Sequence, residues 1–139
     1  MLIRGLAFVA LAVACLSAGA SDADERSPIQ FTRGAIDATL EGAVVRGDRD
    51  IYPINASAGQ TMTVSVSGLE DNVAFQIYPP GTHYSQDELD IWTFHARPVR
   101  GTEADTTAWS RRLASAGQYL IVVGSTRGNA TYSLNVRIE

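Results

Sequence analysis

Residues 117–138 read GQYLIVVGSTRGNATYSLNVRI, and this stretch decides the fold. Apolar side chains occupy alternate positions on both sides of a polar connection, namely Tyr119, Ile121 and Val123 before it and Ala130, Tyr132, Leu134, Val136 and Ile138 after it. A period of two is typical of a β-strand with one buried face. The connection Thr126-Arg127-Gly128-Asn129 is rich in turn formers. The stretch therefore predicts two core strands joined by a tight turn.

The same period recurs through the rest of the chain. Alternating apolar residues appear at Ile36, Ala38 and Leu40, at Met62, Val64 and Val66, and at Val73, Phe75 and Ile77. Turn formers separate these series, for example at 47–50, 69–72 and 79–81. We predict an all-β fold, a single antiparallel β-sandwich of seven to nine short strands, jelly-roll-like, with no helix longer than two turns.

A short internal repeat supports this fold. Ala56-Ser57-Ala58-Gly59-Gln60 recurs as Ala114-Ser115-Ala116-Gly117-Gln118, each time before an apolar strand pattern. Glycine at the same place in both copies indicates a turn with positive φ. Two copies are too few for a solenoid, so we interpret them as equivalent corners of one sandwich.

Residues 1–20 have the pattern of a secretory signal peptide. Arg4 precedes an apolar run over 5–16, and Ala18-Gly19-Ala20 provides the small residues at which signal peptidase cleaves. The run is shorter than the about 20 apolar residues that span a bilayer. We expect cleavage near Ala20.

Cleavage there would leave a flexible leader over residues 21–29 and a domain over 30–139 that is periplasmic or secreted, with no membrane insertion. The alternative is a lipoprotein, because Ala12-Val13-Ala14-Cys15 loosely fits a lipobox with Cys15 as the lipidated residue.

The exported part is acidic and has no cysteine. The chain has 139 residues and a net charge of −4, and without Arg4 ten arginines face fifteen acidic residues, a net charge of −5. Nucleic-acid binding requires clustered basic side chains, so this class is excluded. The charge favours a cationic partner.

No catalytic constellation is present. The sequence has no G-x-S-x-G motif, no cysteine after Cys15, and no histidine near a recognisable nucleophile. We expect a protein that is not an enzyme and that has no cofactor.

Two groups of residues could bind metal instead. His83, Asp87, Glu88, Asp90 and His95 form one group, but their spacing matches no zinc motif and also suits a polar surface loop. Asp48, Asp50 and Asp71 could surround Ca²⁺, although acids in such turns usually serve the turn's own hydrogen bonds. We expect no metal.

Trp92 and Phe94 alternate in the middle of the chain. Such rings could form a carbohydrate-stacking platform, or they could belong to the core, where aromatic side chains supply much of the buried area of a sandwich.

Several spaced motifs within residues 40–138 carry a resemblance to a known family. They are Gly47-Asp48-Arg49-Asp50-Ile51-Tyr52, Ala58-Gly59-Gln60, Ala116-Gly117-Gln118-Tyr119 and Ala130-Thr131-Tyr132-Ser133-Leu134. Together they resemble the bacterial pre-peptidase C-terminal domain, a jelly-roll-like β-sandwich of secreted proteins.

A second set of residues narrows the resemblance. The spacing of Phe31, Gly34, Ala38 and Gly42, the turn at 48–52 and the pair Thr126-Arg127 are similar to the periplasmic inhibitors of g-type lysozyme, which are stand-alone exported sandwiches. In that family an Arg, a Ser and a Tyr on neighbouring loops are thought to enter the lysozyme cleft.

The resemblance implies candidate partner-binding residues, and it is incomplete. The family's Arg is matched by Arg127, beside Thr126. Its Ser falls at Ala116 and its Tyr at Gly47, so two of the three contacts depart from the family pattern.

Neighbouring side chains supply possible substitutes, Ser115 for the missing hydroxyl and Asp48 for the missing Tyr. We expect the loop that bears Arg127 to lie beside both corners, because sandwich loops cluster at the two ends of the sheets.

Two functions from different classes remain. In the first, the protein is an exported inhibitor that blocks the active-site cleft of a lysozyme, most naturally a g-type one, with Arg127 paired to a catalytic carboxylate. In the second, it is a non-catalytic module of the cell envelope that binds carbohydrate or protein, and Arg127 is an ordinary solvated loop residue.

Overall fold

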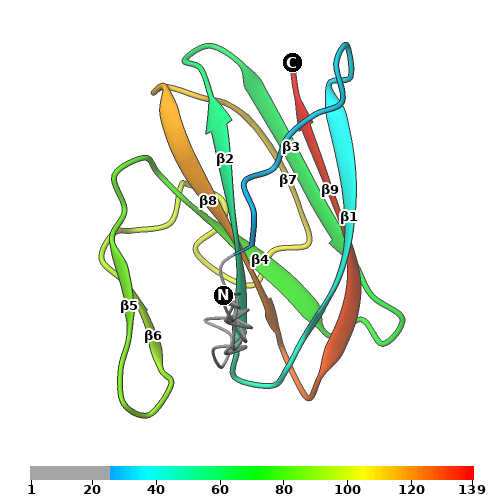
Figure 1. Cartoon of the computed structure of the whole chain (residues 1–139), viewed down its shortest axis with the longest axis vertical. Coiled ribbons are helices and arrows are strands. Elements are labelled where there is room, and N and C mark those ends of the chain that lie inside the picture. The colour runs from blue at the N-terminus through cyan, green and yellow to red at the C-terminus, as the bar shows by residue number, and fades with distance from the viewer. Residues whose placement is uncertain (1–25) are drawn as a thin grey trace, which may run out of the picture.

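Nine β-strands and no helix are present in residues 26–139, which are the residues that the computed structural model describes (Figure 1). The strands are β1 (Asp37–Val44), β2 (Arg49–Ala56), β3 (Thr61–Ser67), β4 (Val73–Tyr78), β5 (Tyr84–Gln86), β6 (Trp92–Phe94), β7 (Ala108–Arg112), β8 (Gly117–Ser125) and β9 (Ala130–Ile138). No helix in this range is long and apolar enough to cross a bilayer. The all-β prediction is confirmed. The expected signal peptide, Cys15 and the first leader residues lie outside the described residues.

The strands form two main antiparallel sheets. One has the order β1-β9-β3-β7 and the other the order β2-β8-β4. Their apolar faces meet in one core, which confirms the antiparallel sandwich. Because β8 and β9 belong to different sheets, the turn at 126–129 carries the chain from one layer to the other.

The core contains most of the alternating residues that the sequence predicts, whereas Ile36 is 44% exposed. Tyr119, Ile121 and Val123 of β8 are buried, and so are Tyr132, Leu134 and Val136 of β9. These side chains contact one another across the two layers, together with the alternate residues Val73, Phe75 and Ile77 of β4.

The outer face of the β2-β8-β4 sheet is covered as well. The small β5-β6 sheet packs Trp92 and Phe94 against this face, where the ring of Phe94 stacks on Tyr78 with centroids 4.6 Å apart. Leu120 and Val122 of β8 are buried beneath these rings. The expectation of a half-buried strand is therefore wrong for β8, which is buried on both faces. Of the two interpretations of Trp92 and Phe94, packing in a core is the one that this arrangement favours.

Both edges of the same sheet carry irregular segments. On the β2 edge the amides of Arg26 and Ile29 donate to the carbonyls of Ile51 and Pro53, each at 2.8 Å. On the β4 edge the amide of Val99 donates to the Ile77 carbonyl at 2.7 Å. These bonds occupy edge groups that would otherwise be free to pair with another chain. Residues 26–29, which we expected to belong to a flexible leader, are instead hydrogen bonded to the domain, and Ile29 is buried.

A buried carboxylate connects the leader with both sheets. Asp50 is 2% exposed, and its Oδ1 accepts a hydrogen bond from Nη2 of Arg26 at 2.9 Å. Its Oδ2 accepts one from the hydroxyl of Tyr132 at 2.5 Å, and that hydroxyl lies 2.6 Å from the hydroxyl of Tyr52. Burial, followed by the hydrogen bonds to Asp50 and Tyr52, raises the pKa of Tyr132 far above its ordinary value of 10.0. The phenol therefore stays protonated and donates to Asp50, so Tyr52 is the donor to Tyr132.

The two copies of the repeat form corners with a glycine at positive φ, as predicted, and the two corners are adjacent. The backbone φ is 86° at Gly59 and 144° at Gly117. The amide of Gly59 donates to the carbonyl of Leu113 at 2.8 Å, which ties the first corner to the chain just before the second. Ala56 pairs with Gly117 across β2 and β8. Both corners thus lie at the same end of the sandwich.

Replacement of Tyr132 by Phe should destabilise the fold by about 1.5 to 3 kcal/mol, because Asp50 and Tyr52 would each lose a buried hydrogen-bond partner. Tyr119→Phe is the matched control. It removes one neutral hydrogen bond, from the Tyr119 hydroxyl to the Ser115 carbonyl, and should cost about 0.5 to 1.5 kcal/mol. Urea denaturation measures both, and equal losses would contradict a special role for the Asp50 network.

Candidate functional site

Three connections meet at one end of the sandwich, at the foot of the view in Figure 1. They are the β1–β2 turn (45–48), the β3–β4 turn (68–72) and the β8–β9 turn (126–129), and we call them together the Arg127 end. The amide of Arg46 donates to Oδ1 of Asn129 at 2.9 Å, and the amide of Thr126 donates to the Asn72 carbonyl at 2.8 Å. The three turns are therefore one connected surface.

Asn72 holds these turns together from beneath. It is 2% exposed, and its side-chain Nδ2 donates to the carbonyls of Arg127 and Asn129, both at 2.9 Å. Backbone carbonyls in a turn between sheets have no partner in a neighbouring strand. The buried Asn72 amide donates to two of these carbonyls and so fixes the shape of the turn. The backbone position of Arg127 is thus fixed by a residue of a different turn.

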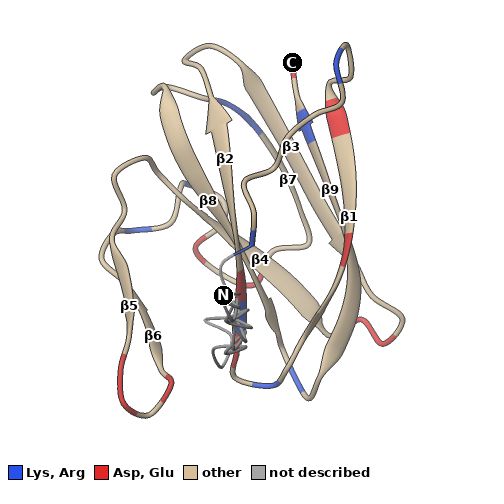
Figure 2. Cartoon of the chain, in the orientation of Figure 1, with Lys and Arg blue, Asp and Glu red and all other residues tan. Residues whose placement is uncertain are grey.

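The side chain of Arg127 is exposed and lies over the β3–β4 turn. Its Nη2 donates to the Glu70 carbonyl at 2.7 Å. The ion pairs in the described part of the chain join Arg26 to Asp50 and Arg137 to Glu139, and neither involves Arg127. A guanidinium has five N–H donors in a rigid fork, so Arg127 keeps donors for a carboxylate on a partner. Figure 2 shows basic residues on the β1–β2 and β8–β9 turns and acidic residues on the β3–β4 turn.

The other predicted residues of this end have defined local roles. Gly47 has a φ of 83° and open space around its Cα, so the turn requires a residue tolerant of the left-handed region. Asp48 accepts hydrogen bonds at Oδ1 from the amide of Arg49 at 3.0 Å and from Nε1 of Trp92 at 3.3 Å. Thr126 is exposed beside Arg127. The structure therefore places Gly47, Asp48 and Thr126 at the same end as Arg127.

Ser115 and Ala116 lie at the opposite end, and the expectation that they adjoin Arg127 is wrong. They precede β8, whereas Arg127 follows it, and the nine residues of β8 span about 26 Å at roughly 3.3 Å per residue. The pairing of Ala56 with Gly117 and of Arg49 with Gly124 fixes these two ends. The physical reason is that consecutive corners of a sandwich alternate between its ends. Whether Ser115 and Ala116 contact any partner stays a prediction.

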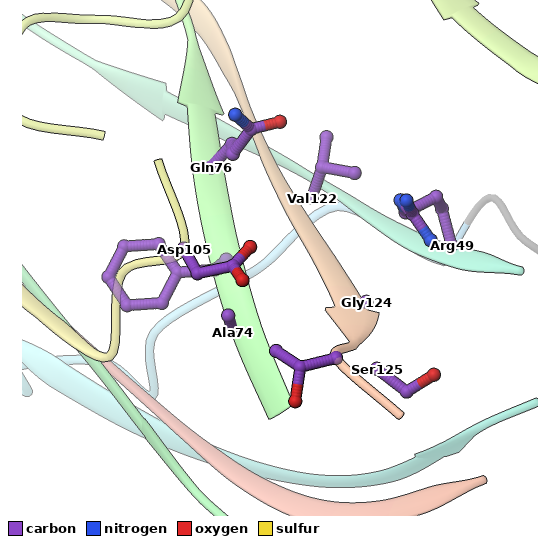
Figure 3. Close-up of a pocket in the computed structure, with 9 residues that line it drawn as sticks. Arg49, Ala74, Gln76, Asp105, Val122, Gly124 and Ser125 are labelled. Carbon is purple, nitrogen blue, oxygen red and sulfur yellow. The ribbon is translucent and has the colours of Figure 1, made fainter. Parts of the chain in front are cut away.

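A shallow groove runs along the outer face of β4 and β8 next to the Arg127 end (Figure 3). Figure 3 shows Arg49 and Asp105 on opposite sides of the two strands, with Gln76 above them. The groove holds about 60 Å³. Pockets for small molecules are usually about 300 to 1,000 Å³, so this groove is too small for a sugar ring.

The acidic and histidine residues considered as metal ligands do not gather. Asp50 bonds to Arg26 and Tyr132, and Asp87 accepts at Oδ1 from the amides of Leu89 and Ile91. Within residues 26–139 no three His, Cys, Asp or Glu side chains are placed to hold a metal ion. Asp50 serves the core and Asp87 serves the backbone of its own turn instead.

Sequence reasoning missed three residues of this end. The sequence identifies Asn72 only as a turn residue, because the carbonyls that it binds lie 55 and 57 residues further along the chain. Leu69 is 96% exposed and Val45 is 60% exposed, and both line one open hollow of about 320 Å³ at the Arg127 end. An apolar residue at the head of the polar turn Leu69-Glu70-Asp71-Asn72 was the available signal for Leu69.

Comparison with solved structures identifies the family. The periplasmic lysozyme inhibitor of g-type lysozyme from Aeromonas hydrophila is 31% identical to this chain, with a TM-score of 0.62, over 84% of this chain and 98% of the inhibitor. The chain belongs to the family of periplasmic inhibitors of g-type lysozyme. Family members from Salmonella Typhimurium (22% identity, TM-score 0.57) and Escherichia coli (a mutant, 23% identity, TM-score 0.58) share the fold, each over 84% of this chain.

The match extends over nearly the whole length of these two family members, 98% of the Salmonella protein and 100% of the Escherichia coli one. No family model and no curated protein sequence matches the chain. Family membership therefore rests on the structural comparison together with the 31% identity.

Replacement of Asn72 by Ala should destabilise the domain by about 1 to 3 kcal/mol, because the Arg127 and Asn129 carbonyls would both lose a buried donor. Asn55→Ala is the control, since Asn55 is an exposed asparagine of β2. Urea denaturation measures the stability, and hydrogen exchange of the 126–129 amides should accelerate only in the Asn72 variant. Unchanged exchange there would contradict the bracing role of Asn72.

Excess EDTA should leave the melting temperature of the purified domain unchanged, because no three His, Cys, Asp or Glu side chains within residues 26–139 are placed to hold a metal ion. A metal site filled to a hundredfold above its dissociation constant would contribute about 2.7 kcal/mol. Thermal melts with and without the chelator make the measurement. A drop of many degrees would point first to Asp48, Asp50 and Asp71.

Proposed function

We propose that this protein is an exported inhibitor of a g-type lysozyme and that the Arg127 end enters the active-site cleft of the enzyme. The observation that carries the proposal is membership of the inhibitor family, at 31% identity over 98% of the Aeromonas hydrophila inhibitor. The similar proteins are inhibitors rather than enzymes, and they are periplasmic. The proposal extends their role and location to this chain, with signal cleavage near Ala20.

The geometry of Arg127 supports a direct role in inhibition. Glycosidases place two carboxylates about the bond that they cleave, so their clefts offer an acidic target at the centre. Asn72 fixes the backbone of Arg127, and the guanidinium of Arg127 donates to the Glu70 carbonyl. A fork of donors held in this way loses little freedom when it pairs with a carboxylate. Arg127 is the proposed anchor of the complex.

The shape of the Arg127 end also suits a cleft. Its turns join the strands at one end of the sandwich, and Gly47 and Thr126 add no large side chain to them. Ser115 and Ala116 stay outside the proposed contact because the length of β8 separates them from it. The contact in this protein is therefore smaller than the three-residue contact that the family resemblance implies, and Asp48 is a rim residue that also bonds to Trp92.

The charge of the whole domain supports the encounter with the enzyme. A net charge of −5 creates a field that attracts a cationic lysozyme from a distance, while the basic Arg127 side chain makes the local contact. The association rate should accordingly fall as the salt concentration rises.

Replacement of Arg127 by Ala should weaken inhibition of a g-type lysozyme by about 2 to 5 kcal/mol, roughly 30-fold to several thousandfold, because a buried carboxylate of the enzyme would lose its partner. The free energy of unfolding should change by no more than about 0.5 kcal/mol, since Arg127 is exposed in the free protein. The inhibition constant in a lysis assay and a urea titration measure the two effects.

Arg33→Ala is the matched control. Arg33 is exposed shortly before β1 at the opposite end, so its loss should leave inhibition unchanged. Ser115→Ala should also be silent. If the unmodified protein binds no g-, c- or i-type lysozyme at micromolar concentration, the proposal fails, and a non-catalytic envelope module that binds carbohydrate or protein becomes the better description. Inhibition indifferent to Arg127 would move the contact elsewhere, first to residues 82–107.

A further inference from the structure

The Arg127 end exposes two large apolar side chains on adjacent turns. Leu69 on the β3–β4 turn is 96% exposed and Val45 on the β1–β2 turn is 60% exposed. Both line the hollow of about 320 Å³, and Leu69 also borders a second open hollow of about 520 Å³. Leu69 therefore stands between two recesses as an apolar projection.

The surroundings of Leu69 combine polar and apolar side chains. The polar ones around the two hollows include Glu41, Ser67, Glu70, Asn129, Thr131 and Ser133, and the apolar ones include Ala43, Val44 and Ala130. An apolar centre within a polar rim is the usual composition of a protein–protein contact. A single exposed leucine needs no explanation by itself. Two large exposed apolar side chains that line the same hollow form a small apolar patch, and such patches mark interaction surfaces.

The turn that bears Leu69 is fixed in place. A Cβ at Gly68 would lie 2.8 Å from the Thr131 carbonyl oxygen, so the chain passes too close to β9 for any other residue. Asp71 has a φ of 49°, and its amide donates to the Gly68 carbonyl at 3.3 Å. The next residue, Asn72, is buried and bonded to the β8–β9 turn. Leu69 is thus presented on a preformed turn, which lowers the entropy lost on binding.

Leu69 and Arg127 also belong to one structural unit. The bond from Nη2 of Arg127 to the Glu70 carbonyl joins the guanidinium to the residue that follows Leu69. Contacts that dominate binding are enriched in Arg and are surrounded by contacts that exclude water. Water exclusion beside a charge pair strengthens that pair, because the local dielectric constant falls.

We infer that Leu69, supported by Val45, is an apolar anchor that docks against the g-type lysozyme beside its acidic cleft and shields the Arg127 contact from water. This inference rests on the proposed function. The occupant of this surface is the enzyme itself, because the projection is continuous with the proposed Arg127 contact and a convex, fixed projection fits a concave partner. The enzyme surface that receives it must be an apolar recess next to the cleft carboxylates.

The test replaces Leu69 by Ser and measures inhibition of a g-type lysozyme in a lysis assay, with the full exported chain. The inhibition constant should rise about 10- to 100-fold, as expected for loss of one buried leucine side chain. Leu89→Ser is the matched control, because Leu89 is 79% exposed in the turn between β5 and β6, which is not one of the three turns that form the Arg127 end. It should inhibit like the unmodified protein. Leu69→Met keeps an apolar side chain of similar volume and should retain most of the inhibition.

The melting temperatures of all three variants should equal that of the unmodified protein, since both leucines are exposed. If Leu69→Ser inhibits as well as the unmodified protein while Arg127→Ala does not, the anchor is overturned and the proposed function stands. If Leu69→Ser and Leu89→Ser weaken inhibition equally, the effect is not local and the anchor is again overturned. If the unmodified protein neither binds nor inhibits the enzyme, the proposed function fails and the anchor fails with it.

Discussion

The buried carboxylate of Asp50 is the constraint on which the arrangement of the domain depends. A buried ion costs several kcal/mol unless it is fully paired, and Asp50 meets this requirement with partners from two other segments, Arg26 of the leader and Tyr132 of the opposite sheet. The phenol of Tyr52 extends the chain of hydrogen bonds between the layers. Gly42 of β1 leaves the space that the Tyr132 ring occupies, since a Cβ there would overlap the ring. The separation and offset of the two sheets are therefore set by polar geometry as well as by apolar packing.

This network lies directly beneath the Arg127 end. Asp50 is the second residue of β2, just after the β1–β2 turn, and Tyr132 is the third of β9, just after the β8–β9 turn. Fixing the sheets at this level also fixes where those turns emerge, and Asn72 then joins the turns to one another. The surface that we propose to bind lysozyme is consequently supported by two buried polar groups, the Asp50 network between the sheets and the Asn72 side chain between the turns. A rigid surface of this kind suits an inhibitor, because binding then requires little reorganisation.

The fold could be predicted from the sequence because its signal is local. Alternation in 119–123 and 130–138 and the glycines at Gly59 and Gly117 describe strands and corners without reference to the rest of the chain. The site could be predicted only in part, because it depends on which corners share an end. The sequence placed Ser115 beside Arg127, whereas the register of β8 separates them. In the sequence Asp50 resembles a turn residue, because its partners lie far away along the chain. The burial of the outer face of β8 by the β5-β6 sheet could not be predicted for the same reason.

The order of the strands also has a consequence for how the protein is made. β8 is the central strand of the β2-β8-β4 sheet, and β9 lies between β1 and β3 in the other sheet. Of the nine strands these two leave the ribosome last, so β1, β2 and β4 have no main-sheet neighbour until β8 and β9 have been made. Folding dominated by such distant pairings is slow. A nascent chain that ends before Gly117 would keep its apolar strands exposed to chaperones and proteases.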